Sequence, residues 1–169
     1  MPRPFFLGSF LLVLVVFKAQ AQPQSPRAST PEDRAKAVEI ARSLESDPLG
    51  KQAKDQRAWL ILWLTEVQDI NVKACTKLLG PVVGSKKNYD SELFTQTLAS
   101  AAAFIITNPS KAKEDLAVYT AGLEGTLRTY ESILKVKPKA KWPFLDDLLD
   151  KRNKGELAEH VRQSATHCK

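Results

Sequence analysis

The sequence predicts an all-α protein, an irregular multi-helix bundle of about five to seven helices. Apolar residues recur at spacings of three and four along most of the chain. Proline, glycine and capping residues separate these amphipathic stretches in the way that helix ends do. No segment alternates apolar and polar residues between hairpin turns, which is the pattern of a half-buried strand.

The amino terminus has the pattern of a signal peptide. Arg3 precedes an apolar run at 5–17 (FFLGSFLLVLVVF), and the small-x-small tripeptide 19–21 follows. The run is about 13 residues long, whereas a membrane-spanning helix needs about 20. We therefore expect cleavage after Ala21, secretion or a periplasmic location, and no stable membrane span afterwards. The alternative is a buried amino-terminal helix.

The predicted domain organisation is a signal peptide at 1–21, a flexible leader at 22–30 and a single helical domain at 31–169. The leader is rich in Gln, Pro and Ser and has little to bury. Cleavage leaves 148 residues, which suits one domain with its own core. It also lowers the formal net charge from +6 to +4. This modest excess does not indicate a nucleic-acid binder, so no nucleic acid is expected as a partner.

Two helices are expected first. Thr30-Pro31 supplies an N-cap and a first-turn proline, and apolar residues at helical spacing follow as far as Leu44. The second helix follows the Asp47-Pro48 start signal and contains the run 58–64 (AWLILWL). Seven consecutive apolar residues cover every face of a helix, so the sequence predicts a central, enclosed helix here. A strand is the competing interpretation, but the flanking residues lack glycine and proline.

Two more helices follow before residue 108. A short one is expected at 71–79, ended by Gly80-Pro81. A longer one is expected at 90–107, ended by Asn108-Pro109. Its run of small residues at 99–103 (ASAAA) would let a neighbouring helix approach closely.

Ser110 is predicted to cap a long helix that extends to Val136. Its apolar stripe is the cleanest of the chain and consists of Leu116, Tyr119, Leu123, Leu127, Tyr130 and Leu134. Gly122 and Gly125 weaken this helix, so a bend or a close contact is expected there. Helical spacing resumes at Trp142-Pro143 and continues to Val161, with Gly155 as a potential break.

Part of the long helix resembles a tetratricopeptide repeat. Tyr130-Glu131, Ile133-Leu134 and Pro138 are similar to the second half of such a unit, over about nine residues. The Trp-Leu-Gly pattern of the first half is missing upstream. The resemblance implies a tetratricopeptide-like helical stack as the alternative to an irregular bundle.

The chain has two cysteines, Cys75 and Cys168. In an oxidising compartment such a pair can form a disulfide, which would tie the carboxy-terminal tail to the middle of the chain. The rival interpretation is a buried Cys75 in an apolar helical stretch and a free Cys168 on the tail.

No catalytic residue or cofactor is predicted. The sequence lacks a Gly-x-Ser-x-Gly elbow, a phosphate-binding glycine loop and a haem-attachment motif. The only candidates for metal ligands are Glu156, His160, His167 and Cys168. Their spacing matches no established metal motif, so a solvated tail is the preferred interpretation and no metal is predicted.

The candidate binding residues are Lys135, Lys137, Lys139, Lys141 and Trp142, within 134–142 (LKVKPKAKW). No acidic residue interrupts this segment, which could lay cations and an indole ring against phosphate or lipid headgroups. The alternative is an ordinary solvated connection between two helices.

Aromatic residues suggest one further possibility. Trp59 and Trp63 lie one helical turn apart and could line a ligand groove with Phe94 and Phe104. Core packing is the preferred interpretation of this spacing.

The functional prediction is an exported, non-enzymatic helical domain that binds a protein or an anionic component of the cell envelope. One alternative is an enzyme with an unfamiliar site near the carboxy-terminal histidines. Another is a carrier of hydrophobic ligands.

Overall fold

The computed structural model describes residues 27–168, and most of these residues are helical. The predicted signal peptide at 1–21 and residues 22–26 of the predicted leader lie outside this range. The structure confirms an all-α multi-helix bundle, and its elements are α1 (Pro31–Ser46), α2 (Ala53–Glu66), η1 (Thr76–Val82), α3 (Asp90–Thr107), η2 (Pro109–Lys111), α4 (Asp115–Val136), α5 (Pro143–Asn153) and α6 (Leu157–Ala165). No helix within the described range combines the length and apolar composition that crossing a bilayer requires.

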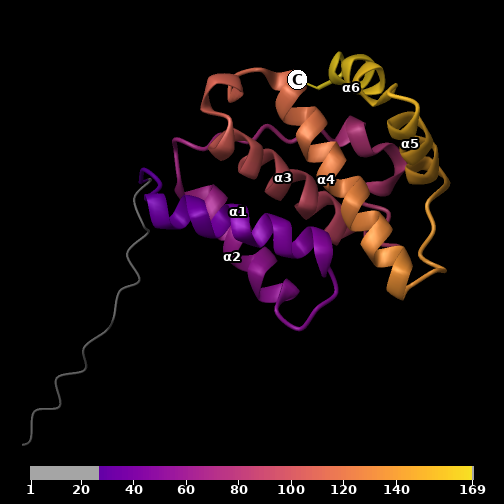
Figure 1. Ribbon diagram of the computed structural model, residues 1–169, viewed down its shortest axis with the longest axis horizontal. Coiled ribbons are helices and arrows are strands. Elements are labelled where there is room, and N and C mark those ends of the chain that lie inside the picture. Colours follow the sequence, from indigo (N-terminus) through magenta and orange to yellow (C-terminus); the bar gives the residue numbers. More distant parts are fainter. Residues whose placement is uncertain (1–26, 169) are drawn as a thin grey trace, which may run out of the picture.

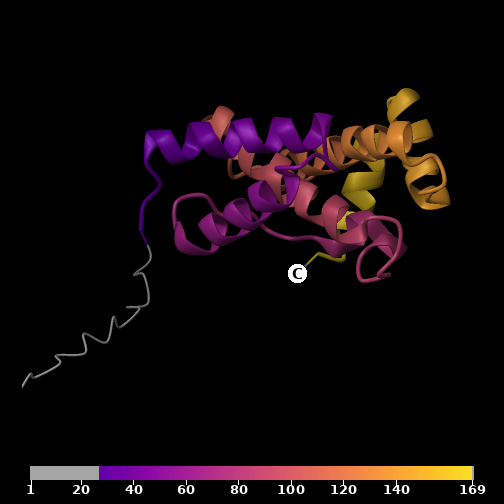
Figure 2. The ribbon, with the colours of Figure 1, turned by 90° about the horizontal axis from the view of Figure 1, so that it is seen from below.

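The central feature is the close packing of α3 against α4, with α1 lying across both (Figures 1 and 2). A Cβ atom added to Gly122 would lie 2.9 Å from the carbonyl oxygen of Thr97, and one added to Gly125 would overlap Ser100 Oγ. Any side chain at these positions would therefore push the two helices apart. The predicted close contact at the two glycines and the small-residue run is confirmed, and α4 continues through both as one helix.

Two hydrophobic clusters flank this pair of helices. One lies where α4 meets α5, α6 and η1, and its large buried members include Leu123, Leu127, Tyr130, Leu145 and Leu148. The other joins α1, α2 and α3 and includes Leu44, Leu60, Trp63, Ala99 and Ala102. Burial of such side chains contributes about 1.5–3 kcal/mol each for a Leu-sized residue.

Polar contacts, from buried to exposed, hold α1 in place. Glu45 accepts hydrogen bonds from Ser100 on α3, at 2.8 Å, and from the Arg128 guanidinium on α4, at 2.8 and 3.0 Å. The Gln96 amide on α3, 1% exposed, donates to the carbonyl of Ala41 at 3.0 Å. These contacts join three helices through paired polar groups, so they specify the register of α1 as well as stabilise it.

The amino-terminal end of α1 forms as the sequence predicts. Thr30 is the N-cap, and its hydroxyl accepts the backbone N–H of Asp33 in a capping box. Upstream, the backbone of Arg27 pairs with Glu66 and Gln68 through two hydrogen bonds of 3.0 and 3.1 Å. Residues 27–30, the described part of the predicted leader, therefore lie against the end of α2.

The prediction that α2 is an enclosed helix is wrong. Its fully buried residues are Ala53, Leu60 and Trp63, whereas Leu62 is 59% exposed and Ile61 is 37% exposed. The helix lies at the edge of the bundle and packs on one side only (Figure 2). A continuous apolar run gives no information on which side of a helix has a neighbour, and this is why the prediction failed.

Two helix boundaries also differ from the predictions. The expected helix at 71–79 is extended up to Cys75, and η1 follows with a kink at Gly80, where φ is +48°. Ser110 does not cap the long helix, because it lies within η2 and α4 begins at Asp115. The potential break at Gly155 is real: its φ is +77°, and it separates α5 from α6.

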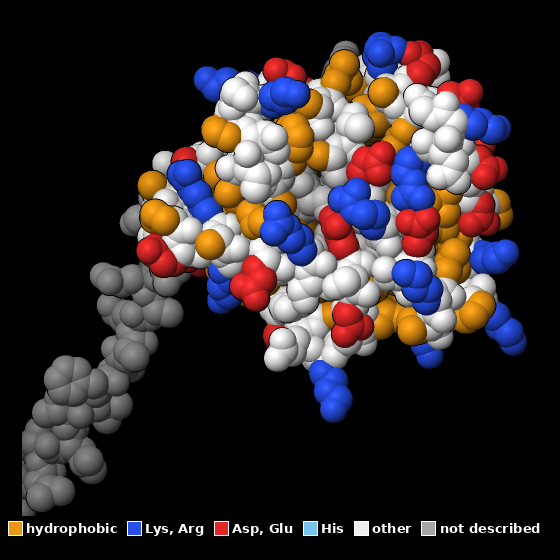
Figure 3. Space-filling view, viewed as in Figure 1, with side chains coloured by type: hydrophobic (Ala, Val, Ile, Leu, Met, Phe, Trp, Pro, Cys, Tyr) orange, Lys and Arg blue, Asp and Glu red, His pale blue; other side chains and the backbone are white. Residues whose placement is uncertain are grey.

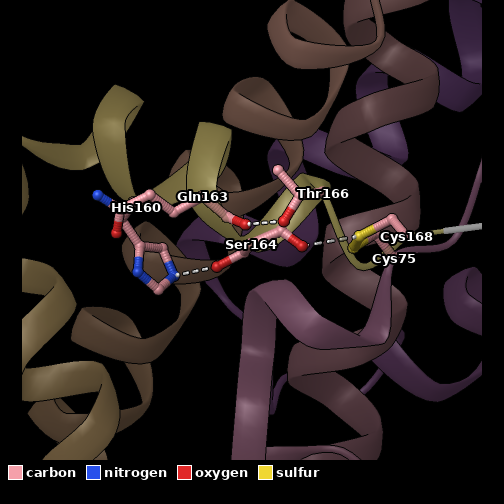
Figure 4. The surroundings of a disulfide bond; sticks show 6 residues. All are labelled: Cys75, His160, Gln163, Ser164, Thr166 and Cys168. Atoms are coloured by element: carbon pink, nitrogen blue, oxygen red, sulfur yellow. Dashed lines mark hydrogen bonds between the residues drawn. A yellow bond between two sulfur atoms is a disulfide. The ribbon is translucent and has the colours of Figure 1, made fainter.

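The two cysteines form a disulfide that joins the start of η1 to the residues after α6 (Figure 4). Their Cα atoms lie 5.3 Å apart and their separation along the chain is 93 residues. Cys75 is 5% exposed and belongs to the cluster around α4. The disulfide therefore closes a long loop of the chain, and one of its two cysteines is buried in the core.

We predict that the disulfide is a major contributor to stability. Replacing both cysteines (Cys75→Ser with Cys168→Ser) would lower the free energy of unfolding by about 4 kcal/mol, because the unfolded chain regains the entropy of a long open loop. Urea titrations of the oxidised protein and the double variant measure this difference. Equal unfolding free energies, or free thiols in the native protein detected by mass spectrometry, would contradict the prediction.

A second prediction concerns pH and the contact between the amino-terminal residues and α2. Burial acts to raise the pKa of Asp69, but hydrogen bonds from the Ser29 backbone, the Ser29 hydroxyl and Arg34 outweigh it and lower this pKa from 3.8 to about 2. The ionised carboxylate therefore stabilises the fold above pH 4, and this contribution is lost as the pH falls towards 2.

The test compares the free energies of unfolding of the native protein and Asp69→Asn between pH 6 and pH 2. The native protein is expected to be more stable at pH 6, and the difference is expected to shrink as the pH falls. A difference that stays constant over this range would show that ionisation of Asp69 does not stabilise the fold.

Candidate functional site

The predicted lysine segment lies directly after α4. The helix ends at Val136, and the N–H of Lys137 closes its last turn on Ile133 at 2.7 Å. A turn follows, in which the N–H of Ala140 bonds to the carbonyl of Lys137 at 2.9 Å and the Ala140 side chain is buried. The lysines at 135, 137, 139 and 141 are all exposed. The turn thus anchors its apolar residue inside and leaves the cations outside.

A second segment lies against this one, in the loop that precedes α3. The Asn88 amide donates to the carbonyl of Lys141 at 3.1 Å, and the Trp142 indole N–H donates to the carbonyl of Asn88 at 3.0 Å. This loop contains three non-glycine residues with positive φ, Lys86, Asn88 and Tyr89, at 59°, 44° and 64°. Such backbone is strained and is maintained here by its hydrogen bonds, including the one from the Lys86 N–H to Asp90 Oδ2.

The contact between the two segments adds Lys86 and Lys87 to the predicted cations. We call the resulting set of exposed residues the lysine surface; it consists of Lys86, Lys87, Lys135, Lys137, Lys139 and Lys141. Within residues 27–168, none of these six ammonium groups lies within 4.0 Å of a carboxylate oxygen. Figure 3 shows basic side chains projecting at the lower right, over the end of α4 and the segment after it.

Trp142 takes part in building this surface. Its indole N–H is bound to Asn88, its backbone N–H donates to the Tyr130 hydroxyl at 2.8 Å, and its side chain is half-buried. The sequence-based hypothesis had placed this ring against headgroups alongside the lysines. In the structure the ring instead joins the two lysine-bearing segments.

Tyr130 connects the lysine surface to the core. Its hydroxyl accepts the Trp142 N–H and donates to Asp146 Oδ1 at 2.8 Å, and the residue itself has no exposed surface. Burial and the neighbouring Asp146 carboxylate raise the pKa of Tyr130 to about 12. The phenol is therefore neutral at physiological pH and remains available both as donor and as acceptor.

The weak metal-ligand candidates do not come together. Cys168 is bonded to Cys75 (Figure 4). Glu156 and His167 are exposed, and His160 is half-buried with its ring edge-on to Phe144 at a centroid distance of 6.1 Å. His160 Nε2 lies 3.4 Å from Ser164 Oγ, one turn along α6. Among residues 27–168, no group of three or more His, Cys, Asp or Glu side chains is placed to hold a metal ion.

The aromatic residues named from the sequence belong to the hydrophobic clusters. Trp59 and Trp63 stack at a centroid distance of 5.7 Å, Phe104 packs on the cluster of α1 to α3, and Phe94 packs on the other cluster. A groove of about 410 Å³ lies beside α2, but other residues line it: Ile61, Leu64, Thr65, Val67, Gln68, Ile70, Asn71, Val72, Ala74 and Leu98.

Sequence reasoning identified four of the six lysines and missed the other two. Lys86 and Lys87 are adjacent in the sequence, but nothing there places them beside a segment some fifty residues away.

Comparison of the chain with protein-family models, curated proteins and solved structures finds no match.

We predict that the Tyr130 hydroxyl holds the lysine segment in place. Tyr130→Phe leaves the Trp142 N–H without its acceptor and Asp146 without its donor, and a buried unpaired group costs about 1–3 kcal/mol. We expect a loss of stability of this size and faster amide hydrogen exchange at residues 137–142. Exchange measured by mass spectrometry reports the local change.

Tyr119→Phe is the matched control, because Tyr119 is also buried on α4 and its hydroxyl has no hydrogen bond among the described residues. Its effect on stability is expected to be within about 0.5 kcal/mol. Unchanged exchange at 137–142 in Tyr130→Phe would contradict the proposed role of the hydroxyl.

Proposed function

We propose that this protein is an exported, non-enzymatic domain that binds the anionic lipid headgroups of an envelope membrane through its lysine surface. The observation that carries the proposal is that six exposed lysines lie on two segments that contact each other through Asn88, with no carboxylate among the described residues in ion-pair contact with them. Clustered cations attract phosphate groups far more strongly than the same charges spread over the molecule.

Apolar groups among the lysines favour a lipid surface over a free phosphate ion. Val136, between Lys135 and Lys137, is 62% exposed, and Pro138 is exposed as well. A membrane interface accepts both kinds of group, because apolar side chains enter the headgroup region while cations pair with phosphates.

The hydrogen bonds beneath the lysine surface favour binding. Asn88, Trp142 and Tyr130 hold the two segments in one arrangement before any partner arrives. Less conformational freedom then has to be lost on binding, and a larger share of the electrostatic attraction appears as affinity.

Export is part of the proposal. The signal-peptide pattern at 1–21 supports it, and the Cys75–Cys168 disulfide agrees with an oxidising compartment. Amino-terminal sequencing of the protein isolated from its host tests this part, and Gln22 is the expected first residue. Recovery of chains that still begin at Met1 would contradict it.

We predict that binding to anionic vesicles depends on the lysines that follow α4. Each lysine near an anionic surface contributes about 1 kcal/mol, so replacing Lys135, Lys137, Lys139 and Lys141 by Gln would weaken binding on the order of 1,000-fold. Cosedimentation with phosphatidylglycerol–phosphatidylcholine vesicles measures this, and vesicles of phosphatidylcholine alone are expected to bind little protein.

The matched control replaces four exposed lysines elsewhere on the chain by Gln: Lys77, Lys111, Lys113 and Lys154. It removes the same net charge, so equal losses in the two variants would show that only overall charge matters and would reject the lysine surface as the site. Absence of binding by the native protein at low salt would reject membrane binding altogether. An acidic protein would then be the partner to test.

A further inference from the structure

A groove lies at the start of α4, at the opposite end of this helix from the lysine surface. Its volume is about 380 Å³, within the range of sites that bind small molecules. The extended segment after α2, the turn before α4 and the first turns of α4 line it: Asn71, Lys73, Ala112, Lys113, Asp115, Val118 and Tyr119. We call this hollow the α4 groove.

Tyr119 places an unpartnered hydroxyl at the wall of the α4 groove. The residue is 8% exposed and belongs to the hydrophobic cluster around α4. Its hydroxyl makes no hydrogen bond with any described residue, yet it is not enclosed, because among the described side chains only Trp63 and Thr129 have a buried polar atom without a partner. The hydroxyl is therefore the part of Tyr119 that reaches the groove. Buried tyrosines usually find a hydrogen-bond partner, and a ligand in the groove would supply one.

The phenol of Tyr119 keeps its proton at neutral pH. Burial raises the pKa of Tyr119, the Asp115 carboxylate one turn earlier raises it further, and Lys73 acts in the opposite direction. A neutral hydroxyl can donate a hydrogen bond, so an acceptor on the ligand would satisfy it. Asp115 is itself held by the Lys73 ammonium, at 2.7 and 2.8 Å, and is not that acceptor.

The charges around the α4 groove favour an anion. Lys73 and Asp115 neutralise each other, whereas Lys113 is exposed and has no carboxylate oxygen of the described residues within 4.0 Å. The groove also adjoins the amino-terminal end of α4, which no described side chain caps and which carries the positive end of the helix dipole. The Asn71 amide adds a neutral donor to the wall.

We propose that the α4 groove binds a small organic carboxylate whose apolar body is the size of an aromatic ring. The Tyr119 hydroxyl and the Lys113 ammonium bind the carboxylate, and the side chains of Val118 and Ala112 contact the apolar body. Apolar walls with a few polar groups are typical of small-molecule sites. The single negative charge of a carboxylate matches the one ammonium group that no carboxylate neutralises.

This inference does not depend on the lysine surface, and benzoate is the probe that tests it. Titration of the full chain, followed through its amide NMR signals, is expected to show saturable binding with a dissociation constant of about 1 mM. The signals of residues 112, 113 and 118 are expected to shift most. Benzamide has the same shape without the charge and is expected to bind about tenfold more weakly. Inorganic phosphate is expected not to displace benzoate.

Two substitutions test the residues of the α4 groove. Tyr119→Phe removes only the hydroxyl and is expected to weaken benzoate binding about tenfold, whereas Tyr89→Phe, the matched control, lies outside the groove and is expected to leave it unchanged. Lys113→Gln is likewise expected to weaken binding more than Lys111→Gln, because Lys111 does not line the groove. Circular dichroism checks that each variant remains folded.

Several outcomes would overturn the proposal. Absence of saturable benzoate binding, or equal effects of Tyr119→Phe and Tyr89→Phe, would reject the α4 groove as the site. Benzamide binding as tightly as benzoate would show that the site takes a neutral ligand, and displacement of benzoate by phosphate would show a site for simple anions. Loss of benzoate binding in the variant with Gln at 135, 137, 139 and 141 would place the site on the lysine surface instead.

Discussion

The close approach of α3 and α4 is the constraint on which the other contacts depend. Gly122 and Gly125 bring the helix axes near enough for the Thr97 and Thr126 hydroxyls to bond at 2.7 Å. The same approach brings Ser100 to the position where it donates to Glu45 on α1. Larger side chains at the glycines would separate the helices and break both contacts. The packing of α3 against α4 therefore also positions the far end of α4 and the lysine surface that follows it.

Only part of the lysine surface could be predicted from the sequence. The alternating lysines after α4 are local, and their exposure follows from charge and from the buried Ala140. The contribution of Lys86 and Lys87 is not local. It depends on a contact between Asn88 and Lys141, 53 residues apart, and on a loop with three positive φ angles. Local patterns predict helices and their ends, but no pattern within a segment specifies its distant neighbour.

The same reasoning explains the successes and the failure along the helices. The N-cap at Thr30, the span 90–107 and the close contact at Gly122 rest on local chemistry or on residue size, and the structure confirms them. The enclosure of α2 was inferred from apolar content alone. Its apolar residues point both inward and outward, and Ile61 and Leu62 of the outward set stay partly exposed among residues 27–168. The composition of a helix limits how much of its surface can be buried, and the positions of its neighbours in the fold determine how much of that surface is actually buried.

The disulfide divides the chain into two parts that are held together differently. The loop between Cys75 and Cys168 contains every element from η1 to α6, and with them the whole lysine surface. α1 and α2 lie outside this loop and are attached by packing and by contacts such as Glu45 with Arg128. Of the two, α2 has the fewer buried residues. The exposed side chains of Ile61 and Leu62 thus occur on the less enclosed of the two helices outside the covalent loop.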